Sequence, residues 1–283
     1  MLIKAQVEQF NRDGFLVVRG AVDAETLGRL RETTDQFIER SRRVTESNDV
    51  FELEPTHTPE QPRLCRLQHP VKQADIYWQV ATSGEVLDCV EALIGPNIKF
   101  HHSKLNMKVE KDSVEVGWHQ DFAFFPHTNY DLVACGIALD DSTVENGCLL
   151  VVPGSHCTLI YDHRDANREF VGKITEPEED FAAATAQPVE LKAGELSIHH
   201  VCAIHGSSKN TSNQPRRLLI FQYAACDAIA LDKRPPANEF NECVVRGQPA
   251  THARLVGPVS LPLRGEVTGS RSIFERQRAS AKS

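Results

Sequence analysis

The chain has 283 residues, of which 41% are hydrophobic, and a formal net charge of -8. This length fits one large domain or two small ones with a substantial core. The acidic balance argues against general binding of nucleic acid or anionic membranes, and no run of about 18 apolar residues is present to span a bilayer.

The eight cysteines form no CxxC pair, and several lie in apolar runs, which is typical of reduced, buried thiols. The N-terminus MLIKAQVEQF lacks the long apolar core of a signal peptide. These features predict a cytoplasmic protein with no nucleic-acid or membrane partner. They indicate nothing about its oligomeric state.

The first hundred residues predict mainly helices around one strand. A short amphipathic helix is expected over residues 5–13 and a strand over 14–18. Asp23 is expected to cap a helix whose apolar residues recur at helical spacing. Residues 46–64 are polar and contain prolines, which predicts a loop. A further helix over 84–94 is expected to stop at Gly95-Pro96.

From residue 98 onward the pattern changes to short apolar runs bounded by turn formers. Strands are predicted over residues 98–109, 132–139, 148–152, 195–201 and 217–225. Many strands without alternating helices favour an antiparallel sandwich or barrel. The acidic segment 161–188 is expected to be a strandless insertion and a candidate lid, and the last thirty residues to form loop and tail.

The stretch GWHQDF contains the first candidate site residues, His119 and Asp121. On an extended segment, residues i and i+2 point to the same face, so this imidazole and carboxylate would lie side by side. A second His-x-Asp, at 163–165, resembles a kinase catalytic loop. It lacks the accompanying glycine-rich loop and Asp-Phe-Gly, so we interpret it as a solvated loop.

A third ligand must come from elsewhere, and His205 in AIHGSS is the best candidate. Two histidines and one carboxylate leave coordination positions open, which suits a non-heme Fe(II) that binds a co-substrate and O₂. Turn formers fill the segment between His205 and Arg216, so the two residues are expected at facing ends of an antiparallel hairpin. Arg216 could then grip a carboxylate of a diacid co-substrate with two hydrogen bonds.

This ordered set resembles the phytanoyl-CoA dioxygenase-like family of Fe(II)/2-oxoglutarate oxygenases, from about Phe10 to Tyr223. The matching motifs are GFLVVRG, EALIGPNI, WHQDFAFFP, ENGCLLVVPGSH and HGSS with Arg216. The resemblance implies a mainly β fold, with a double-stranded β-helix (jelly roll, cupin-like) core buttressed by N-terminal α-helices. We expect one domain over 1–283, helical to about 97, with the core over about 98–230 and a tail over 231–283.

The resemblance also implies an enzyme, a 2-oxoglutarate-dependent dioxygenase that uses Fe(II), 2-oxoglutarate and O₂. It would hydroxylate an unactivated C–H bond of a small molecule and release succinate and CO₂. By position, the iron ligands would be His119, Asp121 and His205, and Arg216 would anchor the 2-oxoglutarate carboxylate.

Further positions match the family's co-substrate pocket. Ser207 matches a hydroxyl that assists Arg216, Lys104 matches a strand position lining the pocket, and Arg66 replaces a lysine used upstream. Ile137 stands where the best-known member has tryptophan.

Two alternatives to the oxygenase remain open. A Zn hydrolase could use the same three ligands, but it leaves Arg216 unexplained and has no obvious general base. A non-catalytic metal- or ligand-binding jelly roll is the other. Elsewhere, the adjacent pairs His101/His102 and His199/His200 are expected to be structural, because neighbours on a strand face opposite ways. The aromatic residues after Asp121 would line a substrate pocket or fill the core.

Overall fold

The computed structural model describes residues 2–111, 113–231, 239–257, 273 and 277. Within them the helices are α1 (Lys4–Asp13), α2 (Ala24–Ser41), α3 (Pro70–Gln73), α4 (Asp75–Ala81) and α5 (Gly84–Ile94). The strands are β1 (Phe15–Val18), β2 (Phe51–Leu53), β3 (Leu64–Gln68), β4 (Ile98–Lys108), β5 (Val116–His119), β6 (Leu132–Ala138), β7 (Leu149–Val151), β8 (Gln187–Val189), β9 (Leu196–His200), β10 (His205–Ser207), β11 (Arg216–Ala225) and β12 (Val244–Arg246).

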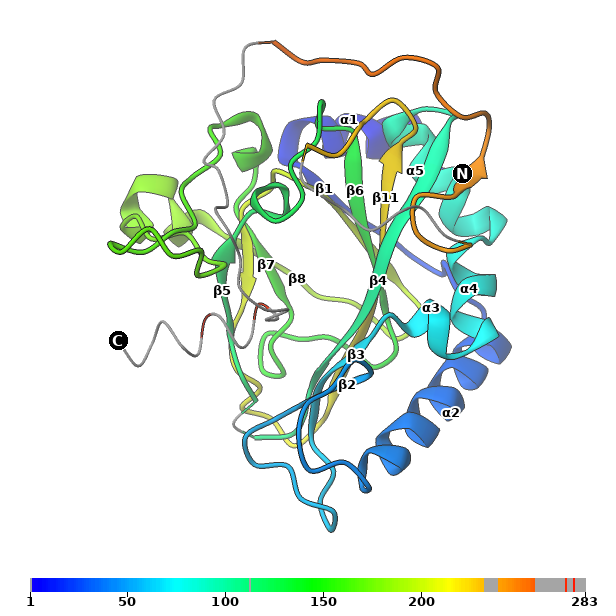
Figure 1. Cartoon of the computed structure of the whole chain (residues 1–283), viewed down its shortest axis with the longest axis vertical. Coiled ribbons are helices and arrows are strands. Elements are labelled where there is room, and N and C mark those ends of the chain that lie inside the picture. Colours follow the sequence, from blue (N-terminus) through cyan, green and yellow to red (C-terminus); the bar gives the residue numbers. More distant parts are fainter. Residues whose placement is uncertain (1, 112, 232–238, 258–272, 274–276, 278–283) are drawn as a thin grey trace.

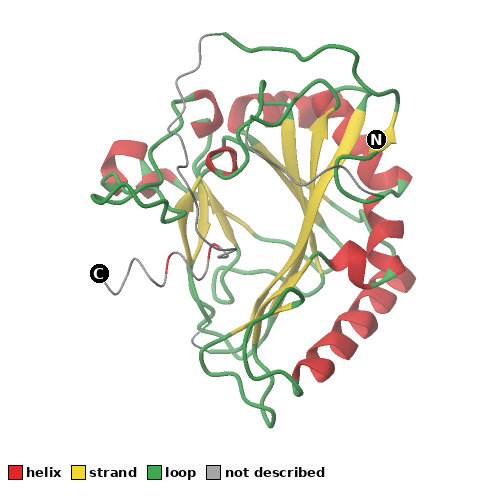
Figure 2. Ribbon diagram, in the orientation of Figure 1, coloured by secondary structure: helices red, strands yellow, loops and turns green. Residues whose placement is uncertain are grey.

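Two antiparallel sheets face each other, and α2 to α5 cover the outer face of the larger one (Figures 1 and 2). The larger sheet runs in the order β1-β9-β6-β11-β4-β3-β2, with β12 also paired to β4. The smaller sheet runs β5-β10-β7-β8. This is the jelly-roll arrangement with flanking helices that the sequence predicts.

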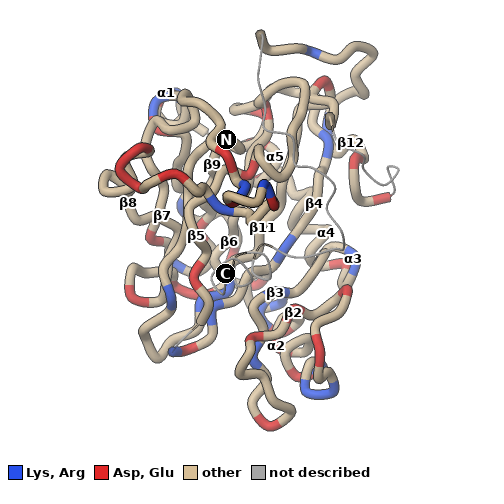
Figure 3. The backbone as a smooth tube through the Cα atoms, turned by 60° about the vertical axis from the view of Figure 1, so that its left-hand side comes forward, with Lys and Arg blue, Asp and Glu red and all other residues tan. Residues whose placement is uncertain are grey.

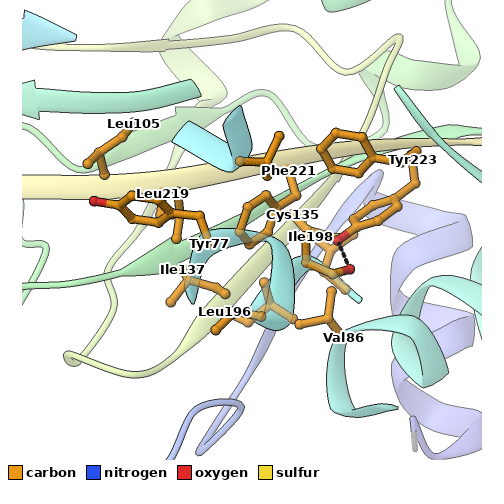
Figure 4. Close-up of a cluster of buried hydrophobic side chains, with 14 of the residues drawn as sticks. Tyr77, Val86, Leu105, Cys135, Ile137, Leu196, Ile198, Leu219, Phe221 and Tyr223 are labelled. Carbon is orange, nitrogen blue, oxygen red and sulfur yellow. Dashed lines mark hydrogen bonds between the residues drawn. The ribbon is translucent and has the colours of Figure 1, made fainter. Parts of the chain in front are cut away.

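Strand β11 separates two environments because successive side chains alternate between the faces of a sheet. Leu219, Phe221 and Tyr223 point toward the helices and are fully buried in the main core (Figure 4). Leu218 and Ile220 instead pack in a second cluster that includes residues of the smaller sheet. One face of the strand therefore builds the core and the other faces the space between the sheets.

The main core also attaches the helices to the large sheet. The hydroxyl of Tyr223 donates a hydrogen bond to the carbonyl of Ala81, at the end of α4, over 2.7 Å (Figure 4). Ile137 lies in the same core and is fully buried. It therefore faces the helices and not the space between the sheets.

Most predicted elements are confirmed to within about two residues at each end. The helices expected over 5–13, after Asp23 and over 84–94 are α1, α2 and α5, and the five strands expected after residue 97 are β4, β6, β7, β9 and β11. The Asp23 side chain accepts a hydrogen bond from the Thr26 N–H at 2.7 Å, as a helix cap does.

The N-terminal portion contains more strand than expected. The prediction of a loop over 46–64 is wrong at residues 51–53, which form β2, and at its last residue, Leu64, where β3 begins. The apolar alternation is hidden here because Glu52 and Arg66, which pair in the register of β2 and β3, are both buried. A further three-residue strand, β12, lies within the segment 231–283 and pairs with β4.

The distribution of basic residues and the burial of the cysteines are as the composition predicts. Lys and Arg residues in the described part of the chain are spread over many elements (Figure 3). Six of the eight cysteines are buried, and all eight are free thiols. Among the described residues, no helix has the length and apolar character needed to cross a membrane.

Candidate active site

A cavity lies between the two sheets, and both sheets contribute to its walls. Six of the seven predicted site residues line it: Arg66, Lys104, His119, His205, Ser207 and Arg216. The seventh, Asp121, lies beside His119, with its Oδ1 3.8 Å from His119 Nε2. The fold therefore brings all seven positions together.

His119, Asp121 and His205 converge on one point. One ligand atom from each lies within 4.8 Å of the others, and all three side chains are buried. His119 ends β5 and His205 begins β10, and the two are directly paired across the small sheet. Strand β5 stops before Asp121, which begins a short 3-10 helix. The carboxylate nevertheless lies beside the imidazole, as the spacing predicts.

Backbone carbonyls orient both imidazoles. His119 Nδ1–H donates to the Gly117 carbonyl and His205 Nδ1–H to the Ala203 carbonyl, each over 2.9 Å. Because a carbonyl only accepts, the proton sits on Nδ1 and the Nε2 lone pair is available. Burial lowers the pKa of His119 to about 4 and holds the pKa of His205 well below its ordinary value. Both rings are therefore neutral near pH 7, as metal binding requires.

Asp121 provides the negative charge of this group. Burial acts to raise its pKa, but Lys104 and the neighbouring imidazoles outweigh burial and hold the pKa well below the usual range. Lys104 Nζ lies 3.7 Å from Asp121 Oδ1, while Oδ2 has no hydrogen-bond partner among the described residues. A buried, unpartnered carboxylate oxygen is costly. Two neutral imidazoles and this carboxylate therefore fit a divalent cation.

Arg216 reaches the cavity from the opposite sheet. The predicted hairpin between His205 and Arg216 is wrong, because β10 pairs with β5 and β7 whereas β11 pairs with β4 and β6. The turn formers between them mark where the chain crosses from one sheet to the other. Turn formers indicate a change of direction, but they do not decide which sheet each flank joins.

The charge of Arg216 is not balanced by a described neighbour. Its side chain is buried, its Nε has no hydrogen-bond partner among the described residues, and burial lowers its pKa to about 10. It therefore remains charged near pH 7. Arg66 differs, because its Nε donates to Asn106 Oδ1 at 2.9 Å and lies 3.9 Å from Glu52 Oε2. Arg216 is thus the better anchor for an anionic ligand.

The two histidine pairs differ from each other. Gln222 faces His102 but Tyr223 faces Phe100, so His101 is the extra residue of a bulge in β4. As a result, the Nδ1 atoms of His101 and His102 lie 2.5 Å apart. The expectation that these neighbours face opposite ways is wrong for this pair.

The second pair does alternate. His200 points away from the cavity and accepts a hydrogen bond from the Cys202 N–H at 3.1 Å. His199 lines the cavity, and its ring centroid lies 4.4 Å from that of His205. The purely structural role expected for all four histidines therefore does not fit the position of His199.

A second group of potential ligands lies away from Asp121. His101, His127 and Glu242 place one ligand atom each within 4.8 Å of the others. Lys99 Nζ, however, lies 2.6 Å from Glu242 Oε2 and already neutralises that carboxylate. The first group is therefore the better cation site.

The aromatic residues after Asp121 have separate roles. Phe122 and Tyr130 pack together in a buried cluster, with ring centroids 4.8 Å apart. The Phe124 ring lies 5.8 Å from His119 and 5.0 Å from Phe170 of the predicted insertion. Phe122 and Tyr130 therefore fill the core, and Phe124 lies at the site.

Two described residues near the C-terminus, Ile273 and Gln277, contact the site, and no sequence pattern predicted them. Gln277 Oε1 accepts from the Gly117 N–H at 2.9 Å, and its Nε2 donates to the Gly172 carbonyl at 2.7 Å. Ile273 lines the cavity. These contacts depend on single side chains far along the chain, so neither periodicity nor a motif marks them.

His163 is not part of a solvated loop. It is almost fully buried, its Nδ1–H donates to the Tyr161 carbonyl at 3.0 Å, and its Nε2 accepts from the Gln120 N–H at 3.0 Å. Gln120 lies between His119 and Asp121, so His163 supports the backbone that carries both. Burial lowers the pKa of His163 to about 4.

This depressed pKa predicts a loss of stability in acid. Between about pH 6.5 and 4 the unfolded chain binds a proton at His163 that the folded chain does not. The free energy of unfolding should therefore fall as the pH falls through this window, by up to about 1.4 kcal/mol per pH unit for this one proton. Urea unfolding of the metal-free protein at pH 7, 6 and 5 measures the slope. His163→Gln should flatten it, and His252→Gln, at an exposed position, is the control; equal slopes for both variants would contradict this account.

Comparison with known proteins gives consistent results. The family model described as phytanoyl-CoA dioxygenase (PhyH) matches residues 10–218. A probable alpha-ketoglutarate-dependent hypophosphite dioxygenase of Stutzerimonas stutzeri is 31% identical over 97% of this chain and 96% of its own length. The peroxisomal phytanoyl-CoA dioxygenase of Homo sapiens is 25% identical over 87% and 75%.

Solved structures are similar to this chain in fold. The Fe-bound structure of EctD from S. alaskensis has a TM-score of 0.69 at 22% identity, over 93% of this chain and 89% of that one. The same protein has also been solved with 2-oxoglutarate and 5-hydroxyectoine.

The jelly roll, the buried group of His119, Asp121 and His205, which could hold a metal ion, and these relatives define an Fe(II)/2-oxoglutarate-dependent dioxygenase, an enzyme that uses Fe(II), 2-oxoglutarate and O₂. The chain belongs to the phytanoyl-CoA dioxygenase family.

Proposed function

We propose that this enzyme hydroxylates an unactivated C–H bond of a small molecule and releases succinate and CO₂. His119, Asp121 and His205 would hold Fe(II), and Arg216 with Ser207 would hold the distal carboxylate of 2-oxoglutarate. One observation carries the assignment: a buried carboxylate oxygen of Asp121 and a buried guanidinium nitrogen of Arg216 both lack described partners around the same cavity. A cation and an anion together would satisfy both.

The residues of the chain have distinct tasks in this reaction. When bound, Fe(II) and 2-oxoglutarate would supply O₂ activation, with one oxygen atom going to the substrate and the other to succinate. The carbonyls that fix His119 and His205 keep both Nε2 atoms aimed at the cation. The planar fork of Arg216 fixes the orientation of the co-substrate. Phe124 and the segment 161–188, as a lid, would exclude water from the reacting centre.

The substrates in the names of the relatives indicate which class of substrate to expect for this enzyme. They include enzymes named for hypophosphite, L-proline and ectoine, which are small and polar, and for phytanoyl-CoA. The net charge of -8 mildly disfavours a polyanion such as a CoA thioester. We therefore favour a small polar substrate.

We also propose that residues 1–283 form one oxygenase domain, because β1 to β3 join the same sheet as the core strands. We propose a cytoplasmic location for the protein.

Succinate formation separates this proposal from its alternatives. With Fe(II), 2-oxoglutarate and O₂, we expect succinate in step with substrate consumption across a screen of small polar molecules. A Zn hydrolase or a non-catalytic binder would form none. Chelation by EDTA is the control and should abolish the signal. Substrate turnover that continues without 2-oxoglutarate, or with Zn(II) alone, would refute the oxygenase.

A further inference from the structure

Directly paired residues on neighbouring strands point to the same face of a sheet, so rows of side chains cross the inner face of the large sheet. We call each row a rung and the set of rows a ladder. At one end Arg216 pairs with Lys108. Six residues further along β11, Gln222 pairs with His102 on one side and with Ala134 on the other. With a rise of about 3.4 Å per residue, the two ends are roughly 20 Å apart along the strand.

The metal-ligand triad lies nearer the Gln222 end of this ladder. Ala134 pairs with His199, so Gln222 and His199 occupy the same rung with a small residue between them. His199 Nε2 lies 3.6 Å from Asp121 Oδ2, and Lys104, on the preceding rung, lies 3.7 Å from Oδ1. The Arg216 end holds the co-substrate in the proposed function, so the Gln222 rung lies on the other side of the cation.

Gln222 is the clearest sign of a missing ligand on this rung. Its side chain has no exposed surface, and neither Oε1 nor Nε2 has a hydrogen-bond partner among the described residues. Its inward-facing neighbours on β11 are Leu218 and Ile220, so packing alone does not call for an amide here. Two unpaired polar atoms in a protein interior are costly and require a partner.

His199 adds two more unpartnered atoms. It is buried, and neither ring nitrogen has a hydrogen-bond partner among the described residues. The 3.6 Å to Asp121 exceeds hydrogen-bond distance. His199 lines the cavity between the sheets, and Gln222 lies one strand further along the same rung, beyond Ala134.

Lys104 supplies charge at the edge of the same space. Fe(II), Lys104 and Arg216 together carry four positive charges, while Asp121 and the 2-oxoglutarate dianion carry three negative ones. The filled site therefore has one positive charge in surplus, and a singly charged anion would balance it. Arg66 and Lys108 do not add to this surplus, because each has a carboxylate nearby: Glu52 Oε2 lies 3.9 Å from Arg66 Nε, and Glu54 interacts electrostatically with Lys108.

We propose that Gln222, His199 and Lys104 form the substrate subsite, and that the substrate is a compact molecule with one singly charged oxyanion group beside the atom that is oxidised. This inference rests on the proposed function, because it takes the Arg216 end as the co-substrate end. The side-chain amide and the ammonium group donate to the oxyanion, and Gln222 Oε1 is left to accept from a hydroxyl or N–H of the substrate.

Gln222→Met tests the subsite directly, because it keeps the shape of the side chain, removes both polar atoms and touches no proposed metal ligand. The protein is loaded with Zn(II) and 2-oxoglutarate, which prevents turnover, and is titrated calorimetrically with acetate, hypophosphite and neutral acetamide. Wild type should bind one or both anions more tightly than acetamide. Gln222→Met should weaken anion binding about 10- to 100-fold and leave 2-oxoglutarate binding unchanged. Lys104→Met should weaken anion binding as well.

A second measurement does not involve ligand. Removing two unpartnered buried atoms should raise the melting temperature of the metal-free protein, so Gln222→Met should gain stability while losing anion affinity. Gln187→Met, at an exposed position of β8, is the control and should change neither. The subsite is refuted if wild type binds 2-oxoglutarate but neither anion, if Gln222→Met binds the anions like wild type, or if it melts at a lower temperature. Failure of wild type to bind 2-oxoglutarate would instead refute the proposed function.

Discussion

His205→Ala is expected to abolish turnover while the fold is retained. The residue supplies one of three proposed protein ligands, and no other described histidine shares its place opposite His119 in the small sheet. Loss of an outer-shell partner of a metal ligand already costs about 10- to 100-fold in metal affinity or activity. Loss of a ligand should cost at least about 100-fold. His119→Ala should behave in the same way, because the two imidazoles are related by direct pairing.

Three measurements check this result. Succinate release gives turnover, metal analysis after anaerobic loading gives iron content, and far-ultraviolet circular dichroism reports the fold. The exposed His252→Ala is the matched control and should keep iron and activity. Full iron occupancy with near-wild-type turnover in either His119→Ala or His205→Ala would show that the ligand assignment is wrong.

Arg216→Ala is expected to weaken 2-oxoglutarate binding by roughly 10- to 150-fold, since a charge-assisted bidentate pair contributes about 1.5 to 3 kcal/mol. Its guanidinium is buried, retains its charge near pH 7 and has an Nε without a described partner, so it is poised for an anion. Iron affinity should barely change. Arg216→Lys keeps the charge but loses the planar fork, so its affinity should fall between those of wild type and alanine.

Anaerobic titration of the absorbance that 2-oxoglutarate produces on binding to the iron protein measures these constants. Arg164→Ala is the control, because Arg164 forms its salt bridge with Asp162, 2.8 Å away. It should leave the 2-oxoglutarate constant unchanged. Wild-type affinity in Arg216→Ala would mean that another cation, with Arg66 or Lys104 next in line, holds the co-substrate.

The elements with strong periodicity were predictable from local pattern. The α2 and α5 helices match the residues expected for them, because their buried residues recur at helical spacing. Strands β6 and β11 match because they are almost continuously buried and appear in the sequence as short apolar runs bounded by turn formers. Short elements were not predicted, because they show no such pattern. β2, α3 and β12 have three, four and three residues, too few to show a period, and they depend on contacts with distant segments.

The candidate site residues could be chosen from the sequence alone: the types and spacing of His119, Asp121 and His205, and an arginine shortly after them. These follow from side-chain identity and from the alternation of an extended chain. Three features required the folded structure: Arg216 enters from the opposite sheet, a bulge places His101 against His102, and His199 and Gln222 face inward with atoms that lack partners among the described residues. The physical reason is that strand pairing and register are set by hydrogen bonds between residues far apart in the chain, whereas a local pattern records only which residues alternate.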